Sequence, residues 1–136
     1  MTLAAGDRRP LGVGAGSLAL LAFLPEEEID EVIASNAARL SDYPRFSPSD
    51  LAALTVKTRE QGYSFNEGRI VTAMCAVGVP VFDPRGRVVA AISVAAIRER
   101  MDDERVDWIV SLLQAEADKL RARLTEISQP QPQATA

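Results

Sequence analysis

The feature that most constrains the fold is a pair of apolar segments joined by a short turn. Residues 72–82 and 87–95 are rich in valine and alanine, and the letters DPRG (residues 83–86) lie between them. Asp, Pro and Gly at the first, second and fourth positions are typical of a type I turn. With the turn glycine in the left-handed conformation, the connection is a three-residue loop in which Asp83 pairs with Arg87. The sequence therefore predicts a β-hairpin.

The register of this hairpin decides which side chains share a face of the sheet. The three-residue loop places Cys75 opposite Ala95 and Val77 opposite Ser93. Because opposed residues point to the same face, Cys75, Ser93 and Ala95 are predicted to lie on one side. A two-residue loop would instead pair Cys75 with Val94 and lose this grouping. We adopt the three-residue loop.

Helical signals surround the hairpin. Apolar spacing and end signals predict helices over residues 17–24, from Pro25 onward, from Ser47 to Gly62, and from about Asp103 to Leu124. Ser47-Pro48-Ser49-Asp50 has the spacing of a capping box, and Gly62 that of a left-handed C-terminal stop. The apolar stripe of the last helix is Val106, Ile109, Val110, Leu113, Ala117, Leu120 and Leu124.

These elements predict a thin α+β domain with an antiparallel sheet flanked by helices. Residues 63–66 add a third short strand, and a sheet of three strands at most must be covered on both faces or find a partner. One face can take the long C-terminal helix, and the other is partly covered by the helices before Gly62. Residues 128–136 are polar and proline-containing, and are predicted to be a disordered tail.

Charge and composition exclude several classes of function. The chain has 15 basic and 19 acidic residues, a net charge of −4, which disfavours nucleic-acid binding by this chain alone. It has no histidine, and this removes Ser–His and Cys–His nucleophile activation and the commonest metal ligand. Its single cysteine excludes an internal disulfide and a cysteine-rich zinc site. We expect no metal and no cofactor.

The opening segment PLGVGAGSLALLAFLPEEE, residues 10–28, invites three interpretations. Two arginines before the apolar run mimic an export signal, but no small-residue cleavage site follows and the run is too short to span a bilayer. A phosphate loop requires a lysine after its last glycine, and none is present. The remaining interpretation is a loop whose glycines allow close backbone packing before a helix. We therefore expect a cytoplasmic protein without a membrane segment.

Four motifs in order resemble one family. GDRRPLGVGAGSLALLAFLPEEE, LTVKTREQGYSFNEG and VGVPVFDPRGRVVAAISVAAIRERMDDERV together resemble the effector-binding domain of the IclR (isocitrate-lyase regulator) family of bacterial transcription regulators. The motifs are Pro-Leu-x4-Gly, Arg-x-x-Gly-Tyr, Pro-Val-Phe-Asp-x-x-Gly and Ala-Ile-Ser-Val. The resemblance covers roughly residues 6 to 125.

The resemblance implies a GAF-like (profilin-like) fold in which one face of an antiparallel sheet forms a small-molecule pocket. Residues 1–127 would be the C-terminal part of an effector-binding domain, incomplete on its N-terminal side. The winged helix-turn-helix domain through which the family binds DNA has no counterpart in this chain. The expected partners are a small-molecule effector and further copies of the chain, as a homodimer or tetramer.

The resemblance also implies a set of site residues. Backbone groups of the glycine-rich loop would line the pocket at Gly14, Ala15 and Gly16, joined by Asn66 after the Gly-Tyr-x-Phe motif. The family's pocket cysteine maps onto Cys75, and its two strand serines map onto Ser93 and Ala95. The amide at position 66 and the methyl at position 95 imply a less polar or differently shaped effector, such as an aromatic or aliphatic acid.

Each polar candidate also has a purely structural interpretation. Cys75 could be a small buried hydrophobic residue, Ser93 could bond to neighbouring backbone, and Asn66 could be a turn residue after a strand. An enzyme with Cys75 as nucleophile would need a basic neighbour, and the nearest in sequence, Arg69, lies in a loop. We expect a ligand-sensing regulatory module and no enzymatic activity. The alternative is a remnant that only oligomerises.

Overall fold

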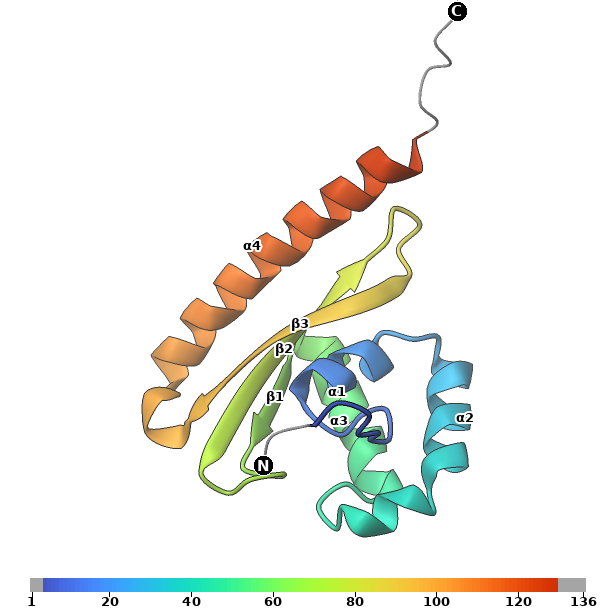
Figure 1. Cartoon of the computed structure of the whole chain (residues 1–136), viewed down its shortest axis with the longest axis vertical. Helices are drawn as coiled ribbons and strands as arrows, with labels where there is room; N and C mark the ends of the chain where they lie inside the picture. Colours follow the sequence, from blue (N-terminus) through green and yellow to red (C-terminus); the bar gives the residue numbers. More distant parts are fainter. Residues whose placement is uncertain (1–3, 130–136) are drawn as a thin grey trace, which may run out of the picture.

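The structure, a computed structural model of the 136-residue chain, describes residues 4–129. Three strands, β1 (Ser64–Glu67), β2 (Met74–Phe82) and β3 (Val88–Ile97), form one antiparallel sheet in the order β1-β2-β3. The helices are α1 (Ala15–Ala22), α2 (Glu26–Asn36), α3 (Pro48–Gln61) and α4 (Asp103–Ser128), with short 3-10 turns at Arg39–Asp42 and Arg98–Arg100. α4 covers one face of the sheet, and α1 lies on the other, with α2 and α3 beyond it (Figure 1). The predicted α+β class is confirmed.

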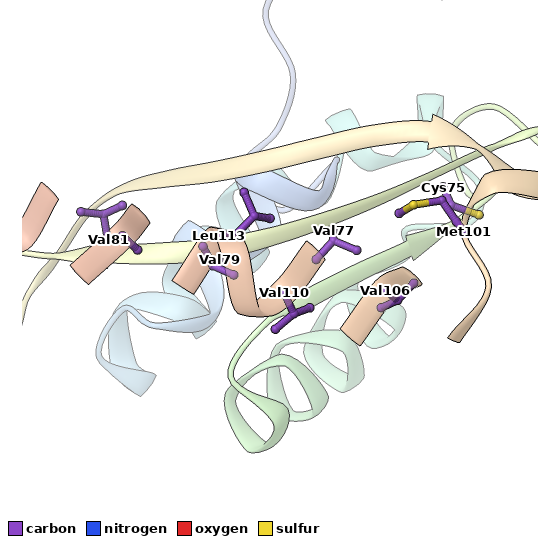
Figure 2. Packing of buried hydrophobic residues seen from close by; sticks show 9 residues of the cluster. Cys75, Val77, Val79, Val81, Met101, Val106, Val110 and Leu113 are labelled. Atoms are coloured by element: carbon purple, nitrogen blue, oxygen red, sulfur yellow. The ribbon is translucent and has the colours of Figure 1, made fainter. Parts of the chain in front are cut away.

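Alternate residues of β2 and one stripe of α4 form the first apolar core (Figure 2). Its buried members are Cys75, Val77, Val79, Val81, Met101, Val106, Val110, Leu113 and Ala117. The stripe predicted for the last helix is buried at Val106, Val110, Leu113 and Ala117. Ile109 and Leu124 are partly buried, and Leu120, which follows the last buried residue of the stripe, is 45% exposed. This first core ties the helix to the sheet through side chains that all point to one face.

The second apolar core lies between α1, α2 and α3. Its buried members are Val13, Leu18, Leu21, Ile29, Ile33, Leu40, Phe46 and Leu51. α1 therefore has the second core on one side and the sheet on the other, and five of its eight residues are buried. The small residues of α1 let its backbone approach β2 closely, so that a Cβ added to Gly78 would lie 2.5 Å from the Ala15 carbonyl oxygen.

The predicted capping box at the start of α3 is confirmed. The Ser47 hydroxyl accepts a hydrogen bond from the Asp50 backbone N–H, and the Asp50 carboxylate accepts one from the Ser47 backbone N–H. Hydrogen bonds from the Ser47 side chain and backbone hold the pKa of the Asp50 carboxyl below its usual value, and the charge of Arg69 acts in the same direction. Gly62 ends the helix in the left-handed conformation, as predicted.

We expect Ser47→Ala to destabilise the domain by about 1 kcal/mol, because the helix loses its N-cap acceptor. The same change should raise the pKa of Asp50 toward its ordinary value, as measured by NMR titration of the carboxyl carbon. Since the folded pKa lies below the unfolded one, the stabilisation by Asp50 is present above the unfolded pKa and is lost as the pH falls through the folded pKa. Ser35→Ala, at an exposed serine of α2, is the matched control and should change neither quantity. An unchanged Asp50 titration in Ser47→Ala would contradict the cap.

The hairpin register is partly as predicted and partly wrong. The Asp83 backbone N–H donates to the Arg87 carbonyl at 2.8 Å, so the three-residue loop is confirmed. One residue further along, the ladder shifts: Phe82 pairs with Val88 but Val81 pairs with Ala90. Val89 is thus the extra residue of a β-bulge.

This bulge separates residues that were predicted to share a face. Cys75 lies opposite Ala96, whereas Ser93 lies opposite Gly78 and Ala95 opposite Ala76. The prediction that Cys75 shares a face with Ser93 and Ala95 is therefore wrong, because one inserted residue turns every later side chain of β3 to the other side.

The C-terminal helix is longer than predicted. It continues to Ser128, and Gln129 is its C-cap, so residue 128 belongs to the helix and not to a tail. Residues 130–136 of the predicted disordered tail lie outside the described residues.

Candidate functional site

The candidate site is the face of the sheet that lies toward α1, which we call the α1 face. The strand register places two rows of small or polar residues across it. These are Ser64, Gly78 and Ser93 in one row, and Asn66, Ala76 and Ala95 in the next. Because the side chains are short, α1 can approach the sheet here and its first turn meets this surface.

The glycine-rich segment forms the N-terminal end of α1. Gly14 is the N-cap residue with φ of 109°, a conformation that side chains with a Cβ rarely adopt. The first helical hydrogen bond runs from the Leu18 N–H to the Gly14 carbonyl at 2.8 Å, so the N–H groups before it have no acceptor within the helix. Within the described chain, no side chain caps this end. The start of α1 is therefore a place where backbone donors remain open to an acceptor.

Ser93 lies beside this helix start. A Cβ added to Gly16 would be 3.2 Å from the Ser93 Oγ, so the hydroxyl faces the first turn of α1 across a gap that the glycine leaves open. Ser93 and Ala95 are exposed, because β3 is at the edge of the sheet. On the α1 face, the β1 residues Ser64 and Asn66 are therefore buried, whereas the β3 residues Ser93 and Ala95 are exposed to solvent.

On the β1 side of the α1 face, two polar residues form hydrogen bonds with neighbouring segments. Ser64 is completely buried, and its hydroxyl donates to the Ala15 carbonyl, which ties α1 to the sheet. Asn66 is 8% exposed, and its Oδ1 accepts a hydrogen bond from the Arg69 N–H at 3.2 Å. This contact supports the turn interpretation of Asn66, since the oxygen holds the loop that follows β1.

Hydrogen bonds from two arginines stabilise the loop after β1. The Arg45 guanidinium donates to the Gly68 carbonyl at 2.7 Å, and the Arg69 guanidinium donates to the Arg45 carbonyl at 2.8 Å. The loop then carries Ile70 to within contact of the position a Cβ of Gly14 would take, at 3.8 Å. Ile70 therefore closes one end of the α1 face with an apolar side chain.

Six of the seven residues predicted from the resemblance come together here, and one does not. Gly14, Ala15 and Gly16 lie at the start of α1, while Asn66, Ser93 and Ala95 lie on the α1 face. Cys75 is 2% exposed on the opposite face, in the core beneath α4 with Met101 and Val106 (Figure 2).

Sequence reasoning missed four residues of this site. They are Ser64, Ala76 and Gly78 on the α1 face, and Ile70 at its end. Ala76 takes the place assigned to Cys75, and only the bulge at Val89 decides between them. No local signal in the sequence marks that bulge. Ser64 could have been found from its alternation with Asn66 along one strand.

None of the helices within residues 4–129 is both long and apolar enough to cross a membrane. Over the same residues, no three potential metal ligands among cysteine, aspartate and glutamate gather to hold an ion.

A short antiparallel sheet with a long helix on one face and small helices over the other is an α+β fold of the GAF-like class. Residues 1–122 match the family described as bacterial transcriptional regulator IclR, C-terminal. The chain belongs to this family.

Individual relatives agree with this assignment. The HTH-type transcriptional repressor AllR of Salmonella typhi is 31% identical over 106 residues, which cover 74% of this chain and 37% of that protein. Among solved structures, the repressor BlcR of Agobacterium tumefaciens superimposes with a TM-score of 0.77 at 27% identity, over 90% of this chain and 51% of that one. The C-terminal domain of the E. coli regulator KdgR superimposes with a TM-score of 0.76 at 28% identity, over 88% of this chain and 73% of that domain. The chain thus spans 37% of the length of the curated repressor and about half of BlcR.

Proposed function

We propose that this chain is the effector-binding and oligomerisation module of a cytoplasmic bacterial transcriptional regulator, and that its ligand is a small organic acid. The observation that carries the proposal is the uncapped start of α1 facing the Ser93 hydroxyl across Gly16. The ligand would bind between the backbone of Gly14, Ala15 and Gly16 and the side chain of Ser93.

The chemistry of the α1 face favours a carboxylate. Backbone N–H groups at a helix start carry partial positive charge and bind anions, and a serine hydroxyl can donate a further hydrogen bond. Asn66 is neutral, so this side of the face does not repel an acid. The methyl groups of Ala76 and Ala95 would contact an apolar part of the ligand. An aliphatic or aromatic acid of small size satisfies both requirements.

The proposed mode of action is a shift between two arrangements of subunits. An effector that binds one arrangement more tightly than the other moves the equilibrium by that difference in affinity. DNA would be bound by a winged helix-turn-helix domain, as the family resemblance implies. We propose no enzymatic role, since Cys75 lies among apolar side chains and the named relatives are transcriptional regulators.

Thermal unfolding in the presence of small carboxylic and aromatic acids tests the proposal. An acid present at about 100 times its dissociation constant should stabilise the domain by roughly 2.7 kcal/mol. We expect Ser93→Ala to reduce this stabilisation, because the variant lacks the hydroxyl opposite Gly16.

Cys75→Ala is the matched control, since Cys75 lies on the opposite face of the sheet. It should lower the melting temperature of the free protein and leave the ligand-induced shift unchanged. A shift that depends on Cys75 and not on Ser93 would contradict the site. If no acid stabilises a protein that still melts cooperatively, the chain is better described as a module that only oligomerises.

A further inference from the structure

Ile70 is an apolar residue beside the polar end of the candidate site. Its Cδ1 lies 3.8 Å from the position that a Cβ of Gly14 would take, and among the described residues no other atom lies within 4 Å of that position. Two residues further along the same turn, Gly16 faces the Ser93 hydroxyl. The first turn of α1 therefore has an apolar side chain at one glycine and a hydroxyl at the other.

The α1 face continues away from the helix start as an apolar surface. Gly78 meets the backbone of α1, and the next row of the sheet consists of Ala76 and Ala95. Met74 and Ile97 form the row after that, still on the same face. An acid whose carboxylate binds the N–H groups of the helix start would place its apolar part over these rows.

The loop that carries Ile70 has a fixed shape. Gly68 has φ of 63°, and a Cβ added to it would lie 2.8 Å from the Thr72 carbonyl oxygen. The Gly68 N–H donates to the Met74 carbonyl at 2.9 Å, which closes the loop. At the other end, the Arg98 N–H donates to the Ala73 carbonyl at 2.9 Å and joins the loop to the end of β3.

Two arginines connect this loop to the second apolar core in both directions. The Arg45 guanidinium donates to the loop at the Gly68 carbonyl, and the Arg69 guanidinium donates back to the Arg45 carbonyl. Phe46, next to Arg45, is 1% exposed in the second core. Ile70 itself is half-buried and packs against the same core. The isoleucine is therefore held against α1 by hydrogen bonds and by packing.

We propose that Ile70 limits the size of the acid that binds at the start of α1, and that Arg45 and Arg69 are positioning residues that hold it there. This inference rests on the proposed function, because it requires a ligand at the helix start. A side chain excludes a larger ligand only if it cannot move aside, and close-packed surroundings resist such movement. The two arginine hydrogen bonds and the second core meet this requirement.

Isothermal titration calorimetry with straight-chain acids from acetate to hexanoate tests the role of Ile70. Ile70→Val removes the Cδ1 that approaches Gly14, and Ile70→Ala removes the side chain beyond Cβ. Each methylene group that gains buried space improves affinity about fourfold. We therefore expect the Kd of butyrate divided by the Kd of hexanoate to rise about fourfold in Ile70→Val and at least about tenfold in Ile70→Ala.

Ile92→Val and Ile92→Ala are the matched controls. Ile92 is a half-buried isoleucine of β3, and it pairs with Val79 on the face that α4 covers. These variants should lower the melting temperature and leave the butyrate-to-hexanoate ratio unchanged. If acids bind in a Ser93-dependent way but the ratio is unchanged in both Ile70 variants, this inference is overturned and the proposed function stands. If neither the natural chain nor the variants bind any acid, both are overturned.

The positioning role has its own test. Arg45→Met removes the donor to the Gly68 carbonyl and should raise the same ratio, whereas Arg45→Lys keeps a donor and should restore it. All acids of the series carry the same charge, so the lost positive charge affects them alike and cancels in the ratio. Arg85→Met, at an exposed arginine of the hairpin turn, is the control and should leave the ratio unchanged. A ratio that Arg45→Met does not change, or that Arg45→Lys does not restore, would overturn the positioning role.

Discussion

Gly78→Ala is expected to destabilise the domain by about 3–5 kcal/mol, because the added methyl group has no space. Its Cβ would lie 2.5 Å from the Ala15 carbonyl oxygen and 2.7 Å from the Ser64 hydroxyl. The first neighbour is backbone, which cannot rotate aside, so α1 would have to move away from the sheet. That movement would break the buried hydrogen bond from Ser64 to Ala15. Urea unfolding followed by circular dichroism measures the loss.

Gly86→Ala is the matched control for this prediction. Gly86 has φ of 81°, and no atom lies within 4 Å of an added Cβ. The substitution therefore strains the backbone, but the new methyl group makes no steric clash. We expect a loss of only about 1–2 kcal/mol there. If Gly78→Ala were no more destabilising than Gly86→Ala, α1 would not pack on β2 as closely as the structure shows. A folded Gly78→Ala protein should also bind the acid more weakly, since the ligand is proposed to bind at the start of α1.

Leu21→Ala should have an effect of similar size through a different cause. Leu21 is completely buried in the core between α1, α2 and α3, beside Leu51 and Phe46. Removing its side chain loses the transfer free energy of the buried carbons and leaves a cavity, and buried Leu→Ala changes cost about 2.7–5 kcal/mol. Because α1 lies between this core and the sheet, we expect unfolding to remain a single transition at a lower midpoint. Chemical denaturation with two probes, circular dichroism and Trp108 fluorescence, measures both properties.

Leu120→Ala is the control, as Leu120 lies on a helix but is 45% exposed. Its expected cost is below about 1 kcal/mol. If Leu21→Ala cost no more than Leu120→Ala, or if the two probes gave separate transitions, the two cores would not form one cooperative unit.

The elements that the sequence predicted well are those whose signals are local. Ser47 and Asp50 form the predicted capping box, Gly62 ends the helix, and Asp83 pairs with Arg87 around the turn. Each of these depends on hydrogen bonds between residues at most four positions apart. The family resemblance was also confirmed, because its motifs combine several such signals in a fixed order.

The candidate site was predictable only in part. The glycine segment and Ser93 meet as the resemblance implied, through the packing of α1 across β3. Cys75 was assigned to the wrong face of the sheet. Ala76, which lies on the α1 face, was not assigned to the site at all. Asn66, which the resemblance assigned to the pocket, lies on the α1 face, and its hydrogen bond with the Arg69 backbone agrees with its interpretation as a turn residue.

The sequence by itself therefore determined the type and order of the main helices and strands, the turn of the hairpin and the family. Only the tertiary structure decided which side chains share a face. The physical reason lies at Val89, where one extra residue in β3 moves every later side chain to the opposite side of the sheet. Nothing in the neighbouring residues distinguishes Val89 from Val88, since the bulge is a property of the paired strands and of the helices that pack on both of their faces.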